Sequence, residues 1–249
     1  MAAIISAYSG YVALALLPPF VWLLFYLKED RHPEPKHLIF LTFIAGIVSA
    51  LAAVVVELGV FGRPPVFNGF FHRFMPTVLA MPFVVFTGVG LIEEYLKYAA
   101  VKFAVLSRAD FDEPIDAMIY MVTAALGFAA IENVLFLVPV LERSFLSGFE
   151  LTTNRFLGAN LLHALSSAIV GYALARHMFS PWRKHAVAGG ILLAGALHTL
   201  FNYFIIIKDA VPTSFLLIIL LLFLMAVVVL VEFERLKKKG TAPRPDVTG

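Results

Sequence analysis

The chain has 249 residues, of which 61% are hydrophobic and only 14% are charged, and none is cysteine. A water-soluble domain is closer to half apolar and a quarter charged, so no soluble fold would hide this much apolar surface and lipid must surround most of the chain. The lack of cysteine excludes disulfides, thiolate metal sites and a cysteine nucleophile. The formal net charge of +2 gives no indication of a nucleic-acid partner.

Seven apolar stretches are each long enough to cross a bilayer, which takes about 20 residues. The third of them is the most polar. We therefore predict an all-α polytopic bundle of about seven transmembrane helices that forms a single domain over residues 1–234. In chain order the predicted spans are 4–27, 38–61, 77–104, 116–140, 156–179, 184–207 and 211–233.

The distribution of Lys and Arg predicts the orientation of the bundle, because these residues are enriched in cytoplasmic loops. With the N-terminus outside, 13 of the 19 Lys and Arg residues fall on the cytoplasmic side, 5 fall on the other side, and Lys97 lies inside a span. This bias predicts an N-out, C-in topology. Residues 235–249 are basic and then rich in Pro and Gly, and we expect them to form a disordered cytoplasmic tail against anionic headgroups.

The third span contains Glu93, Glu94 and Lys97. An ionised group at mid-bilayer costs about 2.5–3.5 kcal/mol, so a span that keeps several of them must face protein or water there. Helical spacing places Lys97 one turn from both glutamates, where it can neutralise one carboxylate and leave the other to act as a base. The alternative is a structural ion pair that locks helix packing. Two acids against one base leave a surplus acid, which favours a function.

Three other spans carry polar residues that hydropathy does not explain. They are Glu132 with Asn133, the single His163, and His198 with Asn202 at i, i+4 on one helical face. For each of them the structural alternative is a buried hydrogen bond that fixes a contact between two helices. An imidazole and a carboxamide on one face can instead bind a developing oxyanion, or the amide can orient the ring.

Taken together, the four spans predict either hydrolytic chemistry or metal binding. A carboxylate and two histidines can activate water and stabilise a tetrahedral oxyanion. They can also hold a metal such as zinc, through Glu93, His163 and His198. The residue pattern leaves both possibilities open, and the HExxH and GxSxG signatures are absent. Non-enzymatic alternatives are a proton- or ion-coupled transporter, whose usual inverted repeats are not evident, and a protein-binding scaffold.

Four stretches resemble the PrsW family of intramembrane proteases, which is related to the CAAX prenyl endopeptidases and bacteriocin-processing enzymes. DRHPEP resembles the family's first loop, IEEYLKY its EExxK motif, and the run ending in GFAAIENVLF its GFAxxEN segment. The last stretch is NLLHALSSAIVG followed by HTLFN, an HxxxN motif. They occur in the family's order between about residues 30 and 205.

The resemblance implies that Glu93 or Glu94, His163 and His198 are catalytic, with Asn202 as the oxyanion partner and Glu132 at the family's third acidic position. It also implies hydrolysis of a membrane-anchored protein, such as an anti-sigma factor cut near its extracytoplasmic side, in a prokaryotic cytoplasmic membrane. The CAAX enzymes carry EExxxR where this chain has Lys97. Both metal-dependent and glutamate-type mechanisms have been described for such proteins.

The mechanism that we expect assigns a role to each group. Glu93 is the favoured general base, and His163 shares or steers the water. His198 and Asn202 stabilise the oxyanion, Lys97 and Glu94 set the charge of the pair, and Asn133 supports the site from outside.

Overall fold

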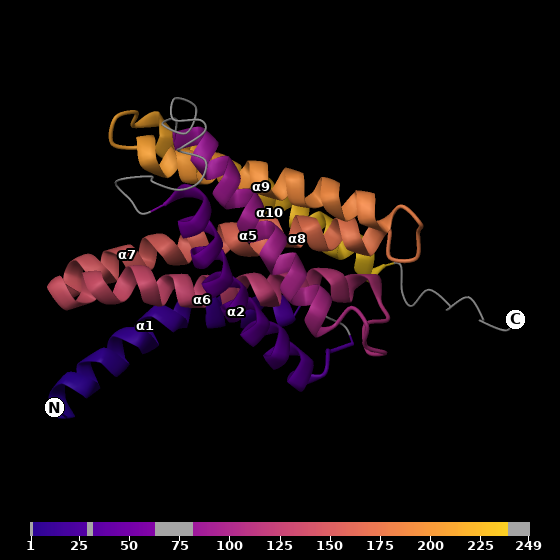
Figure 1. The fold of residues 1–249 in the computed structure, drawn as a ribbon, viewed down its shortest axis with the longest axis horizontal. Helices are drawn as coiled ribbons and strands as arrows, with labels where there is room; N and C mark the ends of the chain where they lie inside the picture. Colours follow the sequence, from indigo (N-terminus) through magenta and orange to yellow (C-terminus); the bar gives the residue numbers. More distant parts are fainter. Residues whose placement is uncertain (1, 29–31, 63–81, 239–249) are drawn as a thin grey trace, which may run out of the picture.

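The computed structural model describes residues 2–28, 32–62 and 82–238, and all regular secondary structure in these residues is α-helical (Figure 1). Most of the helices are long enough to cross a bilayer. In chain order they are α1 (Ala2–Leu27), α2 (Lys36–Phe61), α5 (Pro82–Ala104), α6 (Pro114–Arg143), α7 (Phe145–Leu157), α8 (Ala159–Arg176), α9 (Arg183–Ile207) and α10 (Thr213–Lys237).

The predicted all-α membrane bundle is confirmed, since a long helix coincides with each of the seven predicted spans. In the described part of the chain, six segments qualify as membrane spans by length and composition, with α7 and α8 counted as one. Helix α5 is not among them, because every stretch of it that is long enough contains Glu93, Glu94 and Lys97. Its 23 residues still extend about 35 Å, enough to cross a bilayer.

Parts of three predictions remain untested. The N-out, C-in orientation stays a prediction, because the structure contains no membrane. Residues 77–81 of the predicted third span and 239–249 of the predicted tail lie outside the described residues. Helix α10 continues to Lys237, three residues into the predicted tail.

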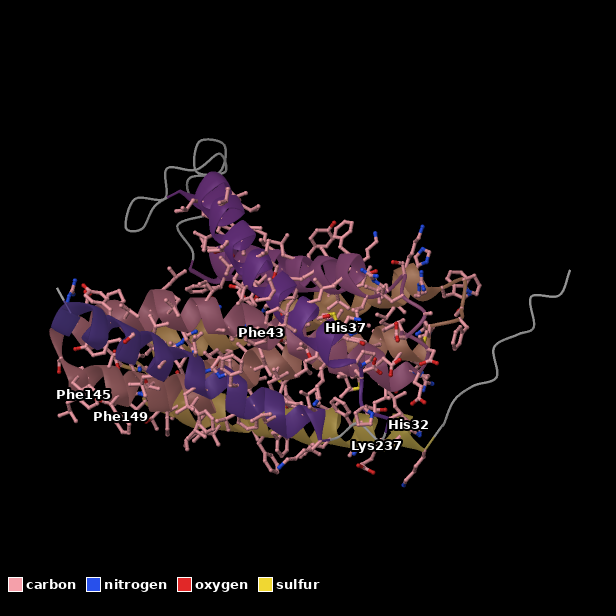
Figure 2. All side chains as sticks on the ribbon, turned by 90° about the horizontal axis from the view of Figure 1, so that it is seen from below. His32, His37, Phe43, Phe145, Phe149 and Lys237 are labelled. Carbon is pink, nitrogen blue, oxygen red and sulfur yellow. The ribbon has the colours of Figure 1, made fainter. Side chains whose placement is uncertain are left out.

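Helix α7 is a structural element that the sequence pattern did not predict. The chain leaves α6 at Arg143, and the hydroxyl of Ser144 caps the new helix by accepting a hydrogen bond from the backbone N–H of Ser147 at 3.3 Å. With 13 residues, α7 is too short to be detected as a span. Phe145 and Phe149 are exposed on its outer surface (Figure 2).

Helix α6 forms the centre of the bundle, and nearly every side chain between Ile115 and Ala130 is buried. Two glycines allow α2 to approach it very closely. A Cβ on Gly46 would lie 2.1 Å from the carbonyl oxygen of Ala124, and one on Gly127 would lie 2.1 Å from that of Phe43. Such close backbone approach is typical of helices that associate in lipid, where small residues form the interface.

Helices α5 and α9 cross at a second pair of glycines. A Cβ on Gly90 would lie 2.8 Å from the carbonyl oxygen of Gly195. One turn away, the hydroxyl of Thr199 lies 2.7 Å from the carbonyl oxygen of Gly195 on its own helix and 3.1 Å from that of Phe86 on α5, so it bridges the two backbones. The crossing places the polar residues of α5 against those of α9.

The bundle has two ends, which we name by the elements found there. The α7 end carries Phe145 and Phe149, whereas His32 and Lys237 lie at the opposite end (Figure 2). The turn between α8 and α9 is also at this opposite end, and we call it the α8–α9 end (Figure 1).

Candidate active site

The structure brings the polar residues of α5, α6, α8 and α9 together in the interior of the bundle. Glu94 and Lys97 are completely buried, and at most 4% of Glu93, His163 and His198 is exposed. These side chains come from helices that are distant in sequence; Glu94 and His198, for example, are 104 positions apart. Burial of so many ionisable groups is tolerated only when they pair with one another.

Lys97 lies at the centre of the cluster. Its ammonium nitrogen Nζ is 2.8 Å from Oε1 of Glu94, 3.3 Å from Oε2 of Glu93 and 2.8 Å from Nδ1 of His163. It also lies over the ring of Phe128, 4.4 Å from the centroid. An ammonium group has three donors, and these three polar partners use all of them.

Glu94 is held on both of its oxygens. Oε1 accepts from Lys97, from the hydroxyl of Ser166 at 2.9 Å and from Nδ1 of His198 at 3.2 Å. Oε2 accepts from the hydroxyl of Ser167 at 2.9 Å. A carboxylate with four donors and no exposure is positioned to hold a charge and orient His198, and it has little capacity left to contact water.

Glu93 has a different environment. Its Oε2 lies 3.8 Å from Nδ1 of His163 and 3.6 Å from Nε2 of His198, and its side chain faces a cavity. Within the described residues, the cation nearest to it is Lys97, which is 0.5 Å nearer to Glu94. Glu93 is therefore the acid of the pair that lines the cavity.

Both histidines are oriented by a carboxylate. Because the ammonium of Lys97 can only donate, Nδ1 of His163 accepts, and Nε2 carries the proton that bonds Oε2 of Glu132 at 2.8 Å. His198 donates from Nδ1 to Glu94, which leaves Nε2 directed at Glu93. The two rings meet edge to face, with centroids 5.1 Å apart.

Arg155, on the unpredicted helix α7, extends the network outwards. Its Nη2 donates to Oε2 of Glu132 at 2.9 Å, and its Nε donates to the side-chain oxygen of Asn133. Asn133 in turn donates to Asn160 at 3.1 Å and to the carbonyl oxygen of Ala15 at 3.0 Å. The predicted spans leave Arg155 in the loop between residues 140 and 156, so the sequence pattern gave it no role in the site. The signal that could have found it was its position directly before a span that contains Asn160.

A cavity of about 450 Å³ opens beside the cluster. Glu93, His163 and His198 form part of its wall, and Asn202 lies on the same wall one turn after His198. The amide of Asn202 has no hydrogen-bond partner among the described residues, so it is available to a ligand. The residues Leu151, Asn154, Arg155 and Lys208 line the cavity towards the α7 end.

The donor atoms of Glu93, His163 and His198 fit a metal ion in their chemistry and spacing. They lie within 4.8 Å of one another, and each histidine is oriented by a carboxylate on its other nitrogen, as metal-ligating histidines usually are. Lys97 contacts two of these three donors. A metal ion at this position therefore requires the ammonium group of Lys97 to move away from them.

Comparison with known proteins matches the model of the "PrsW family intramembrane metalloprotease" to residues 34–231. A curated Protease PrsW of Geobacillus kaustophilus is 26% identical over 187 residues, which is 74% of either chain. That of Bacillus subtilis is 32% identical over 156 residues, 63% of either chain. That of Oceanobacillus iheyensis is 26% identical over 193 residues, 77% of this chain and 81% of that one. No solved structure matches this chain significantly.

Proposed function

Because the chain belongs to the PrsW family of intramembrane proteases, we propose that Glu93, His163 and His198 form the site at which it hydrolyses peptide bonds. The protein is an integral membrane protease of a prokaryotic cell membrane, with a protein substrate and the lipid bilayer as its partners. The observation that supports the site is the convergence of these three buried side chains, from three helices, on one wall of a cavity.

Glu93 acts as the general base in this proposal. Of the two adjacent glutamates it is the one that lines the cavity, whereas Glu94 already accepts four hydrogen bonds. The ring of His163 lies beside this carboxylate, with Nδ1 3.8 Å from Oε2 of Glu93, and it limits where the attacking water can sit, while Nδ1 itself accepts from Lys97. General-base catalysis of this kind contributes a rate factor of about 10² to 10⁴.

His198 and Asn202 stabilise the negative charge that develops on the scissile carbonyl oxygen. His198 acts as a donor from Nε2 when that nitrogen carries a proton, and the contact of Nδ1 with Glu94 fixes the orientation of the ring. The side-chain amide of Asn202 supplies a second donor from the next turn of α9. Donors held in place before the reaction are effective because they need no reorganisation as charge develops.

These groups account for every proton that moves in the reaction. Glu93 takes a proton from water as the water oxygen bonds to the carbonyl carbon, which produces the tetrahedral oxyanion. Collapse of this oxyanion breaks the C–N bond, and the proton on Glu93 passes to the leaving nitrogen. Lys97 and Glu94 remain paired throughout and keep the site close to electrical neutrality.

The same residues suit the metal ion that the family description implies. Glu93, His163 and His198 would hold it, while Glu94 and Glu132 orient the two rings. When bound, a divalent ion such as zinc supplies Lewis-acid polarisation of the carbonyl group and of water. Lys97 would then pair with Glu94 alone.

The substrate that we propose is a membrane-anchored protein, such as an anti-sigma factor, cut near its extracytoplasmic side. Leu151, Asn154 and Lys208 line the part of the cavity that is nearest to the α7 end of the bundle. With the predicted N-out topology, the α7 end is the extracytoplasmic end. This placement supports the proposed cleavage position.

Cleavage of a single-span substrate by purified enzyme in liposomes tests the site. We expect Glu93→Gln and His198→Ala to lower the rate by about 10² to 10⁴. Glu150→Gln and His37→Ala make the same chemical changes at exposed positions and should cleave at the wild-type rate. Wild-type rates in both site variants would overturn the proposal.

Zinc titration addresses the metal separately. Binding of zinc by the site predicts tighter binding to Lys97→Met than to wild type, because two donor atoms lose their contact with the ammonium group. Full activity of chelator-treated, metal-free enzyme would instead show that the glutamate mechanism is sufficient.

A further inference from the structure

A second cavity, of about 670 Å³, lies between α5 and α9 and has no part in the proposed catalytic site. It is formed by the C-terminal half of α5, by Leu106 and Ser107 just after that helix, and by the N-terminal half of α9. This places it near the α8–α9 end, whereas the catalytic cavity is lined towards the α7 end. The two cavities share no lining residue.

Three basic side chains line this groove, namely Lys102 from α5 with Arg183 and Lys184 from α9. No Asp or Glu lines it, and none of the three cations forms an ion pair within the described residues. By contrast, Arg235 at the same end is paired with Glu232 at 2.6 Å. Unpaired cations gathered on one cavity favour an anionic ligand.

Apart from Ser107, the remaining walls are apolar or aromatic. Val187 and Ile191 of α9 form one side, and Tyr98 of α5 forms part of the other. A small soluble anion makes no favourable contact with an apolar wall. The glycerol backbone and first acyl carbons of a lipid would pack against it. The groove therefore combines a charged mouth and an apolar interior on the surface of a membrane protein.

We propose that this groove binds one anionic phospholipid, with the phosphodiester at Lys102, Arg183 and Lys184 and the acyl chains along Val187 and Ile191. Basic pockets between transmembrane helices on the cytoplasmic side are suited to such headgroups. The predicted C-in topology places the α8–α9 end on that side. The proposal does not depend on the catalytic mechanism.

The position of the groove gives the lipid a structural consequence. Lys102 lies eight residues after Glu94 on α5, which is about 12 Å along the helix axis. Helices α5 and α9 are the pair whose contact places Glu94 against His198. A lipid seated between the same two helices, nearer the α8–α9 end, holds their crossing.

Native mass spectrometry of the full-length protein in detergent, titrated with phosphatidylglycerol or phosphatidylcholine, tests the proposal. We expect wild type to bind phosphatidylglycerol at least tenfold more tightly. The triple variant Lys102→Gln/Arg183→Gln/Lys184→Gln should lose this preference, by up to about fivefold for each cation, the equivalent of about 1 kcal/mol. Equal affinity of wild type for both lipids would overturn the proposal.

Two further variants separate a groove from general surface charge. Lys28→Gln/Lys36→Gln/Arg235→Gln removes the same charge at the α8–α9 end and should keep the full preference. Ala188→Trp keeps every cation but fills the groove, since Ala188 is exposed and lines it, so it should lower affinity for both lipids.

Glycerol 3-phosphate distinguishes a lipid site from a phosphate site, and we expect it not to displace the bound lipid at millimolar concentration. Displacement by it, loss of preference in the control triple variant, or undiminished binding to Ala188→Trp would each contradict the lipid assignment.

Discussion

Nζ of Lys97 lies 2.8 Å from Nδ1 of His163, although 66 positions separate the two residues in sequence. The contact joins α5 to α8 and sets the tautomer of His163, because the ammonium group can only donate. It also means that one buried cation contacts both adjacent glutamates and a histidine of the proposed site.

Replacement of Lys97 by Met should strongly destabilise the protein. It leaves Glu93 and Glu94 buried without their shared cation, and breaking a buried ion pair on one side costs about 3–5 kcal/mol. Thermal unfolding in detergent measures the loss. The double variant Lys97→Met/Glu94→Gln also removes the charge of Glu94, which leaves only Glu93 without its cation, and should recover part of the stability. Equal destabilisation by the single and double variants would contradict this account.

Asn202→Ala should lower kcat by about 10² to 10³, the usual cost of removing one donor to an oxyanion. Its melting temperature should stay near that of wild type, because the Asn202 amide makes no hydrogen bond within the described residues. Single-turnover cleavage and a melting curve measure the two quantities. An unchanged kcat would remove Asn202 from the proposed mechanism.

Arg155 acts as a positioning residue, through Glu132 and then His163. We expect Arg155→Gln to lower kcat by about 10- to 100-fold with little change in KM, as found when the partner of a functional histidine loses its own support. Arg155→Lys keeps the charge and should recover part of the rate. The pH profile of kcat should shift in Arg155→Gln, because His163 and Glu132 lose a neighbouring cation, whereas a purely structural role leaves the profile unmoved.

The glycine contact between α5 and α9 predicts a sharp difference between two similar substitutions. Gly90→Ala places a Cβ 2.8 Å from the carbonyl oxygen of Gly195, so the helices must move apart at a cost of about 1–3 kcal/mol. Gly189→Ala, on α9, meets nothing within 4 Å and should be neutral or slightly stabilising. Melting temperatures of the two variants check this, and equal effects would show that the contact is not tight.

Much of the site was predictable from residue types and spacing. Charge inside an apolar span identified Glu93, Glu94 and Lys97, because lipid makes such residues costly unless they face protein. Arg155 was missed because α7 is short and polar, so hydropathy does not distinguish it from a loop. The preference for Glu93 over Glu94 as the base was slight in the sequence, and it now gains support from the hydrogen bonds that occupy Glu94.

The sequence by itself determined that lipid surrounds most of the chain, that the fold is all-helical, which family the chain belongs to and where the long helices lie. All of these depend on local composition and on the order of short motifs. Only the tertiary structure decided which oxygen and nitrogen atoms face one another. Those distances depend on how four helices cross, and the crossings are set by backbone contacts at Gly46, Gly90, Gly127 and Gly195 that no single helix encodes. For this reason the glutamate pair was visible in the chain, while the division of roles between its two members depends on the packing of the bundle.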